Sequence, residues 1–178
     1  TAATLVAGRD TTLNAATAVS VTTSLTAGRT ANATTSSGTL GIASLLAGTD
    51  ATLNASGAVT LGDATATSGD LAITSTGAGI TAATLIAGRD ATVNAATAVS
   101  ITTSLTAGRT ANVTASGGTL GIASLLAGTD ATLSATGAVT LGAATATTGD
   151  LAITSTNAGI TAATLVAGRD TTLNAATA

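Results

Sequence analysis

The sequence predicts an all-β fold, a parallel β-helix (β-solenoid) of about nine coils with about 20 residues in each coil. Three observations support this prediction. Residues 1–80 recur as residues 81–160 with 12 differing positions, and a third copy begins over residues 161–178. Within each block lies a shorter period of 20, visible in the row starts TAATLVAGRD, VTTSLTAGRT, GIASLLAGTD and LGDATATSGD. Apolar residues alternate inside each row, and a fixed period in the twenties is typical of solenoids.

The first row shows how each coil is built. Leu5 and Ala7 alternate with polar neighbours, as in a half-buried strand, and Gly8 then permits a turn. The alternation resumes in residues 13–15 and again in residues 19–21. We therefore expect about three short strands per coil, separated by turns.

Stacking explains why the pattern must repeat. One coil cannot bury its own apolar face, whereas neighbouring coils can bury each other's. The inward residues should then form columns, of which two are Leu5, Leu25, Leu45 and Ala7, Ala27, Ala47. The fourth coil breaks the first column, because Thr65 and its copy Thr145 stand in the place of leucine. An inward threonine needs a ladder hydrogen bond or a local shift in register.

The composition excludes most chemistry. Only ten residue types occur, and His, Cys, Lys, Glu, Gln, Tyr, Trp, Phe, Met and Pro are absent. The usual general bases and activated nucleophiles are therefore missing, which argues against an enzyme, and no zinc site of Cys or His can form. Five arginines and no aromatic residue argue against nucleic-acid binding. The uncharged stretch of residues 30–49 is too rich in Thr, Ser and Asn to insert into a membrane. We expect no cofactor.

A longer motif, L-x-A-G-R-D-x-T-L-N-A, carries a family resemblance. TLVAGRDTTLNAATAV (4–19), TLIAGRDATVNAATAV (84–99) and SLLAGTDATLNASGAV (44–59) resemble the haemagglutinin repeats of filamentous haemagglutinin and related two-partner-secretion exoproteins, including contact-dependent inhibition toxins. The resemblance is weaker in residues 61–80 and 141–160. It implies a right-handed β-helix that serves as the stalk of a secreted adhesin or toxin-delivery fibre on the bacterial surface. The secretion signal and the region that meets a host or neighbouring cell would then lie outside this segment.

Charged residues occupy two places in the repeating row. Arg fills the ninth place in five coils and Asp the tenth in seven, so 12 of 13 charges should line one edge; Asp63 is the exception. One interpretation is a structural turn, in which Asp accepts backbone N–H bonds and Arg neutralises the stacked acids. The other is a calcium site at two pairs whose coils contain no Arg. These candidate residues are Asp50, Asp70, Asp130 and Asp150.

The twelfth and fourteenth places should both face solvent. They contain Thr12 and Asn14, then Asn32 and Thr34, and similar pairs in later coils. One interpretation is a solvated face whose side chains bond along the stack. The alternative is ice binding, by resemblance to the flat threonine arrays of antifreeze β-helices.

The whole chain, residues 1–178, is predicted to be one β-solenoid segment cut from a longer array, since neither terminal coil is atypical. We expect a structural stalk or spacer. Its partners would be neighbouring repeats of the same chain, or further copies joined end to end into a filament.

Overall fold

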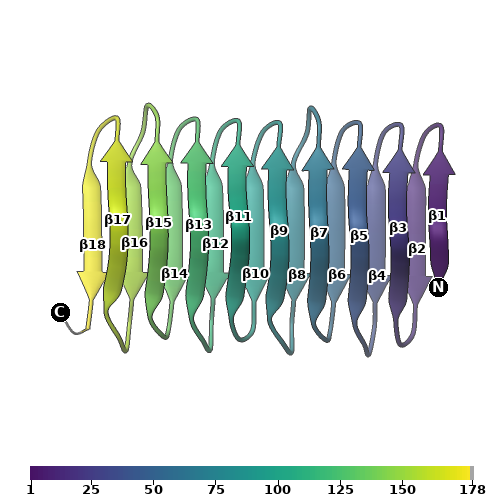
Figure 1. Ribbon diagram of the computed structural model, residues 1–178, viewed down its shortest axis with the longest axis horizontal. Coiled ribbons are helices and arrows are strands. Elements are labelled where there is room, and N and C mark those ends of the chain that lie inside the picture. The colour runs from purple at the N-terminus through teal and green to yellow at the C-terminus, as the bar shows by residue number, and fades with distance from the viewer. Residues whose placement is uncertain (177–178) are drawn as a thin grey trace.

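The computed structural model describes residues 1–176, which form β-strands joined by short corners (Figure 1). The chain ascends along the nearer sheet, crosses to the farther sheet, descends and advances by one coil. This winding is right-handed (Figure 1). All strands are parallel, and each pairs with the equivalent strand of the next coil, as Thr11 pairs with Ala31. The right-handed parallel β-helix of about nine coils is thus confirmed.

The strands form two sheets that face each other. Sheet A contains the odd-numbered strands in chain order and sheet B the even-numbered ones. The strands of sheet A are β1 (Ala2–Ala7), β3 (Val19–Ala27), β5 (Leu40–Ala47), β7 (Val59–Ala66), β9 (Ile80–Ala87), β11 (Val99–Ala107), β13 (Leu120–Ala127), β15 (Val139–Ala146) and β17 (Ile160–Ala167). The strands of sheet B are β2 (Thr11–Ala15), β4 (Ala31–Thr35), β6 (Ala51–Ala55), β8 (Leu71–Ser75), β10 (Ala91–Ala95), β12 (Ala111–Ala115), β14 (Ala131–Ala135), β16 (Leu151–Ser155) and β18 (Thr171–Ala175).

The space between the sheets is filled by small aliphatic side chains in columns. Leu5 pairs with Leu25, and Leu25 pairs with Leu45, as the period predicts. The alanine column from Ala7 through Ala27 to Ala47 is also confirmed. Val, Leu, Ile and Ala of both sheets make one continuous core along the rod. With strands about 4.8 Å apart, nine coils make a rod on the order of 40 Å long.

Each coil contains two strands. The prediction of about three strands per coil is therefore wrong. The third expected strand, which begins at Val19, continues into the first strand of the next coil without a turn, as in β3 and β11. The residues between Val21 and Leu25 are Thr22, Thr23 and Ser24. They contain no glycine or other turn former, so the backbone stays extended and both sequence segments join one strand.

A local register shift resolves the threonine in the fourth coil. Ala64 pairs with Leu45 and is buried, whereas Thr65 pairs with Leu46 on the outer face of sheet A. Ala144 and Thr145 repeat this arrangement in the second block. The shift is one of the two possibilities that the sequence leaves open, and it keeps the hydroxyl out of the core.

This shift is one of several ways in which a short corner is balanced by an extra residue elsewhere in the same coil. The corners from sheet B to sheet A alternate between three residues, as in 16–18, and four, as in 36–39. Where this corner has three residues, an extra residue appears elsewhere in the coil. It lies in the nine-residue strands β3 and β11, where the ladder is irregular, or in the four-residue corners 67–70 and 147–150. Sheet B therefore keeps an unbroken register from coil to coil.

Candidate functional site: the charged corner

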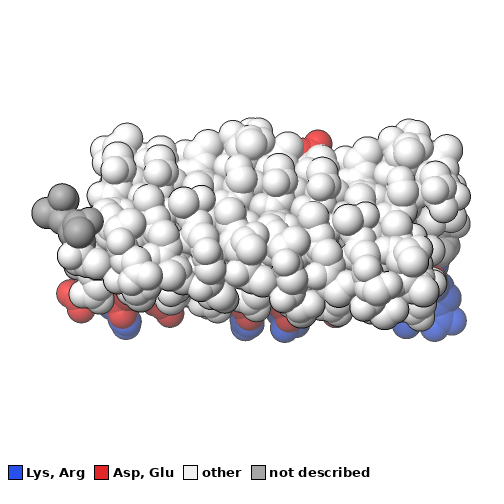
Figure 2. Space-filling view, turned by 90° about the horizontal axis from the view of Figure 1, so that it is seen from below, with Lys and Arg blue, Asp and Glu red and all other residues white. Residues whose placement is uncertain are grey.

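The corner from sheet A to sheet B collects nearly all the charge of the molecule. It contains residues 8–10 in the first coil and the equivalent residues in the others. Figure 2 shows acidic and basic groups along one long edge of the rod, as the sequence predicts. Asp63 lies apart from them, in strand β7 of sheet A. We call the Arg and Asp residues of the ninth and tenth places the charged corner.

Six of the seven Asp residues of this corner, all but Asp170 in the last coil, accept a hydrogen bond from the backbone of the following coil. The carboxylate Oδ1 of Asp10 accepts the N–H of Thr30 at 3.2 Å, and Asp90 accepts that of Thr110 at 3.1 Å. The same bond runs from Asp70 N–H to Asp50 at 2.8 Å. It recurs at Asp70, Asp130 and Asp150. These N–H groups lie between the strands, so the carboxylates continue the hydrogen bonding across the corner.

Arginines pair with the acid of the preceding coil, not with their own sequence neighbour. Arg29 Nη2 lies 2.8 Å from Asp10 Oδ2, and Arg89 Nη2 lies 3.0 Å from Asp70 Oδ2. The pairs Arg109–Asp90 and Arg169–Asp150 have the same geometry. The arginine side chains are more than half exposed, so we expect each pair to contribute little on its own.

The pairing lowers the pKa of three carboxyls. Hydrogen bonds from Arg29 and Thr30 hold the pKa of Asp10 well below its ordinary value. Arg109 lowers the pKa of Asp90 in the same way, and Arg169 lowers that of Asp150. These acids are therefore charged throughout the neutral range, which suits a structural ion pair and not a proton-transfer group.

The four calcium candidates lie at this corner in two equivalent pairs. Asp70 and Asp150 each have an arginine partner from the next coil. The sequence suggested no partner for them, because their own coils contain no Arg. Asp50 and Asp130 have no arginine partner in the described range, and each accepts one N–H bond at 2.8 Å. Within residues 1–176, no three acidic side chains gather as a metal site requires. Calcium binding stays a prediction, and an unchanged melting temperature in millimolar Ca²⁺ would contradict it.

The polar positions of the twelfth and fourteenth places project from the outer face of sheet B. Thr12, Asn14, Asn32 and Thr34 are exposed, and the ladder pairs Thr12 with Asn32 and Asn14 with Thr34. The solvated face is therefore confirmed. Among the described residues, no hydrogen bond joins these side chains to one another along the stack. Ice binding remains an untested alternative for this face.

The opposite corner contains a set of hydroxyls that the sequence analysis misses. Thr35, Ser75 and Ser155 point into the core, and each precedes one of the four-residue corners. Thr35 donates to the carbonyl of Gly38 at 2.8 Å, and Ser155 donates to Gly137 and Ala158 at 2.9 Å. Their signal in the sequence is a Thr or Ser where the other coils have alanine.

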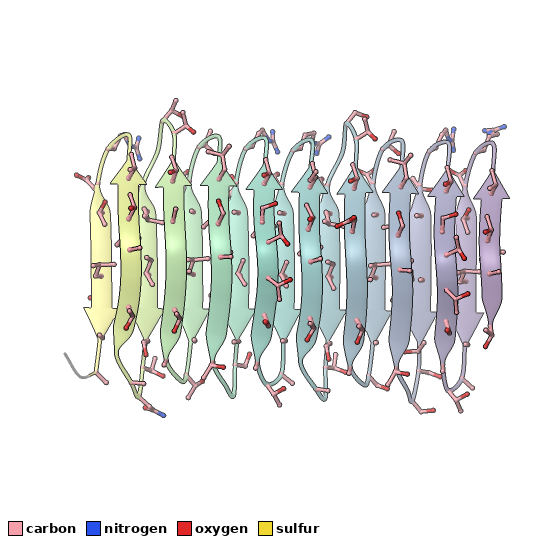
Figure 3. The ribbon with its side chains drawn as sticks, viewed as in Figure 1. Atoms are coloured by element: carbon pink, nitrogen blue, oxygen red, sulfur yellow. The ribbon has the colours of Figure 1, made fainter. Side chains whose placement is uncertain are left out.

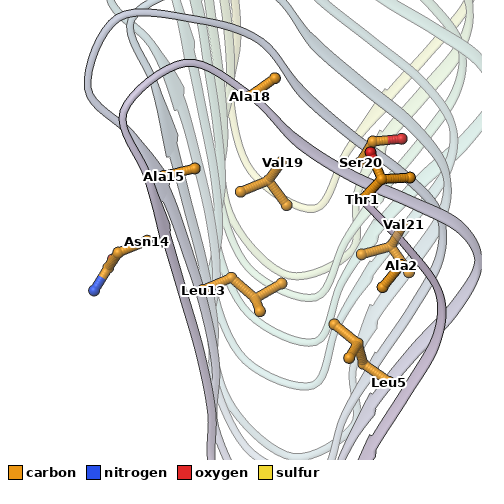
Figure 4. A pocket seen from close by; sticks show the side chains of 10 residues that line it. All are labelled: Thr1, Ala2, Leu5, Leu13, Asn14, Ala15, Ala18, Val19, Ser20 and Val21. Carbon is orange, nitrogen blue, oxygen red and sulfur yellow. The ribbon is translucent and has the colours of Figure 1, made fainter.

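A hollow of about 250 Å³ opens at the N-terminal end of the core (Figure 4). Leu5, Leu13, Val19 and Val21 project into it, whereas Asn14 points away (Figure 4). The hollow is the aliphatic core seen from its end, since these four residues continue the inward columns. Neither Asp nor Arg is among the residues that line it.

None of the described residues belongs to a helix long and apolar enough to span a bilayer. Comparisons with protein-family models, with curated proteins and with solved structures find no match to this chain.

Proposed function

We propose that this chain is a non-catalytic spacer segment of a secreted bacterial surface fibre. The observation that supports it best is the continuity of the rod. Parallel ladders join every successive pair of strands in both sheets, and one aliphatic core runs through all coils. Bending such a rod sharply would break ladder hydrogen bonds and open the core at the same time. The resemblance of the repeated motif to haemagglutinin repeats supports the secreted setting.

The charged corner fits the same proposal. Six of its seven acids bond the next coil, and four of its five arginines bond the preceding one. The charges are thus used within the repeat, as a spacer requires. The duplicated 80-residue block offers a simple way to change length, because each block adds four coils.

The spacer function can be tested by adding one more 80-residue block after residue 160. Four extra coils at about 4.8 Å each should lengthen the rod by about 19 Å and leave its cross-section unchanged. Small-angle X-ray scattering measures both quantities. A block that widens the particle, or leaves its maximum dimension unchanged, would contradict a linear spacer.

The secreted setting needs its own experiment. The chain is placed between the leader domain of a two-partner-secretion protein and a folded reporter. Export should occur, and the distance from the reporter to the cell surface should grow with each added block. Failure of export while the isolated rod keeps its shape would reject the secreted setting and leave the spacer geometry intact.

End-to-end assembly is a second candidate, favoured by the offset of the ion pairs. Within residues 1–176, Arg9 and Asp170 are the members of the charged corner whose counterparts would come from a coil before the first and after the last. For the 178-residue polypeptide, stacking the first coil on the last would bring them together. Sedimentation velocity should then show concentration-dependent oligomers that the Arg9→Ala variant weakens; a monomer at all concentrations argues against it.

A further inference from the structure

One column on the outer face of sheet A contains nearly all the exposed large aliphatic residues. Ladder pairing aligns nine residues there, in which an aliphatic residue alternates strictly with threonine. In order they are Val6, Thr26, Leu46, Thr65, Ile86, Thr106, Leu126, Thr145 and Val166. We call this set the aliphatic column. Figure 3 shows side chains projecting along the nearer face of this sheet.

The column is corrugated. Leu46 and Leu126 are each 45% exposed and Ile86 is 38% exposed, whereas the threonines between them are half-buried. Among the described residues, the only other exposed large hydrophobic is Leu173, at an inward position of the last coil. An exposed apolar row on a regular sheet indicates an interaction surface.

On the side of the column away from the charged corner, the outer face of sheet A is almost uncharged. The neighbouring column contains Thr, Ser and Ala, with Asp63 as its one charge within residues 1–176. All other charges lie at the charged corner. A partner for this face therefore needs to be neutral, flat and repetitive along one axis. A second copy of the same face meets all three requirements.

The dimensions also suit a second copy. Nine strands about 4.8 Å apart, with about seven paired residues at about 3.3 Å each, make a face of roughly 800–900 Å². A standard stable interface buries about 800 Å² on each partner. Sheets pack face to face about 10 Å apart, which small side chains such as Thr and Leu fill without a gap.

We propose that two copies pair through the outer faces of sheet A, with their rods antiparallel and a two-fold axis between β7 and β9. This symmetry places four of the five aliphatic members of the column, all but Val166 on the last strand, opposite a threonine of the other copy. Ile86 faces Thr65, and Leu46 faces Thr106. The raised aliphatic side chains enter the lower threonine sites, as in interdigitating sheets. An axis through β9 would instead place aliphatic residues opposite one another.

Asp63 is the test residue within this face. In the proposed pair it faces Thr84 of the other copy, whose hydroxyl can donate to the carboxylate. Covering an acid still costs desolvation, so Asp63 should weaken the pair. Its counterpart in the second block is Ala143, which shows that the fold accepts alanine at this position. The variant Asp63→Ala should therefore pair more tightly.

The decisive experiment is sedimentation equilibrium of the full 178-residue chain. The native chain should reach a monomer–dimer equilibrium. The triple variant Leu46→Thr, Ile86→Thr, Leu126→Thr should raise the dissociation constant at least tenfold, while Asp63→Ala should lower it about threefold or more. The triple variant copies the residue already found in alternate strands, so circular dichroism should show an unchanged fold. Matched changes on sheet B, Asn54→Thr and Asn94→Thr, should have no effect.

A second measurement tests the antiparallel arrangement. Cysteines are introduced singly at the exposed corner residues Thr17 and Thr76 and spin-labelled, since the chain has no cysteine of its own. Along the rod, the Thr17 labels should be about 24 Å apart and the Thr76 labels about 5 Å apart. Equal separations would indicate parallel rods.

A chain that stays monomeric at millimolar concentration would overturn the proposal, as would equal label separations or a dimer that the triple variant leaves intact. A dimer lost only with Arg9→Ala would assign the association to the ends of the rod and overturn the face-to-face pair. None of these results bears on the spacer function, which requires only the rod.

Discussion

The two sheets pack on the same core and each has nine strands, yet they keep register in different ways. In sheet B the offset between paired residues is constant, from Thr11–Ala31 to Ser155–Ala175. In sheet A the offset alternates. Val19 pairs with Leu40, one position farther along the chain than in sheet B, and Leu40 then pairs with Val59, one position nearer. The length of a whole coil, measured along sheet B, stays constant at 20 residues. An extra residue is tolerated at any place where its side chain can point out of the core.

The difference follows from the length and the exposure of the strands in each sheet. Strands of sheet B have five residues, each inward position packs on the core, and nothing in them can be displaced without exposing an aliphatic side chain. Strands of sheet A are longer and contain an exposed middle segment, such as Thr22 and Thr23 in β3. A bulge there costs no burial, because bulged residues bend outward.

The largest effect on stability is expected when one compensating residue of sheet A is removed. Deleting Thr103 from the nine-residue strand β11 leaves its coil one residue short. Part of the ladder must then slip by one position, which turns inward side chains such as Val99 and Ile101 outward. We expect a loss of about 3–6 kcal/mol from two exposed aliphatic side chains, measured by urea unfolding.

The matched variant adds back one residue at the other place that the molecule uses. It combines the Thr103 deletion with a serine inserted between Ala107 and Gly108, which reproduces the four-residue corner of residues 67–70. Most of the lost stability should return. If the double variant is no better than the deletion, compensation between strand and corner is not the rule that keeps coil length.

The next largest effect concerns glycines of the charged corner. A Cβ at Gly108 would overlap the backbone carbonyl of Gly88 in the preceding coil, whereas a Cβ at Gly121 in sheet A would meet nothing closer than 4.0 Å. Gly108→Ala should therefore cost about 1–3 kcal/mol. Gly121→Ala should be neutral or slightly stabilising. Thermal unfolding of the two variants side by side distinguishes a corner position that needs close approach from a strand position that tolerates a side chain.

A smaller effect is expected at the opposite corner. Ser155→Ala removes the donor to the carbonyls of Gly137 and Ala158 and should cost about 1 kcal/mol. Ala115 occupies the same place before another four-residue corner, so Ala115→Ser should give a gain of similar size. Two variants that both destabilise the protein would mean that the hydroxyl has no supporting role there.

The smallest effect concerns pH. The lowered pKa values of Asp10, Asp90 and Asp150 give stability that is present above the unfolded-state pKa of Asp, about 3.9, and is lost as pH falls through the folded-state values. The chain has no His, Glu or Lys. The melting temperature should therefore be flat from pH 8 to pH 5 and fall below about pH 4. Calorimetry across this range checks it, and a transition near pH 6 would contradict it.

Much of the fold could be predicted because each coil repeats the same physical problem. The period of 20 predicted the stacking, and the alternation of Leu5 and Ala7 predicted which side chains face inward. The charged corner was predicted as a line, since Arg and Asp keep their places from row to row. The pairing of Arg29 with Asp10 was not, because it depends on which coil each side chain leans toward.

The solenoid, its coil length, its core columns and its charged edge could all be predicted from the amino-acid sequence alone. These follow from periodicity and from the need to bury aliphatic side chains. Only the stacked coils show that each coil has two strands, that Ala64 and not Thr65 enters the core, and that one outer column alternates an aliphatic residue with Thr. The reason is geometric: a shift of one residue changes which face a side chain occupies, and only the pairing of neighbouring strands selects that shift.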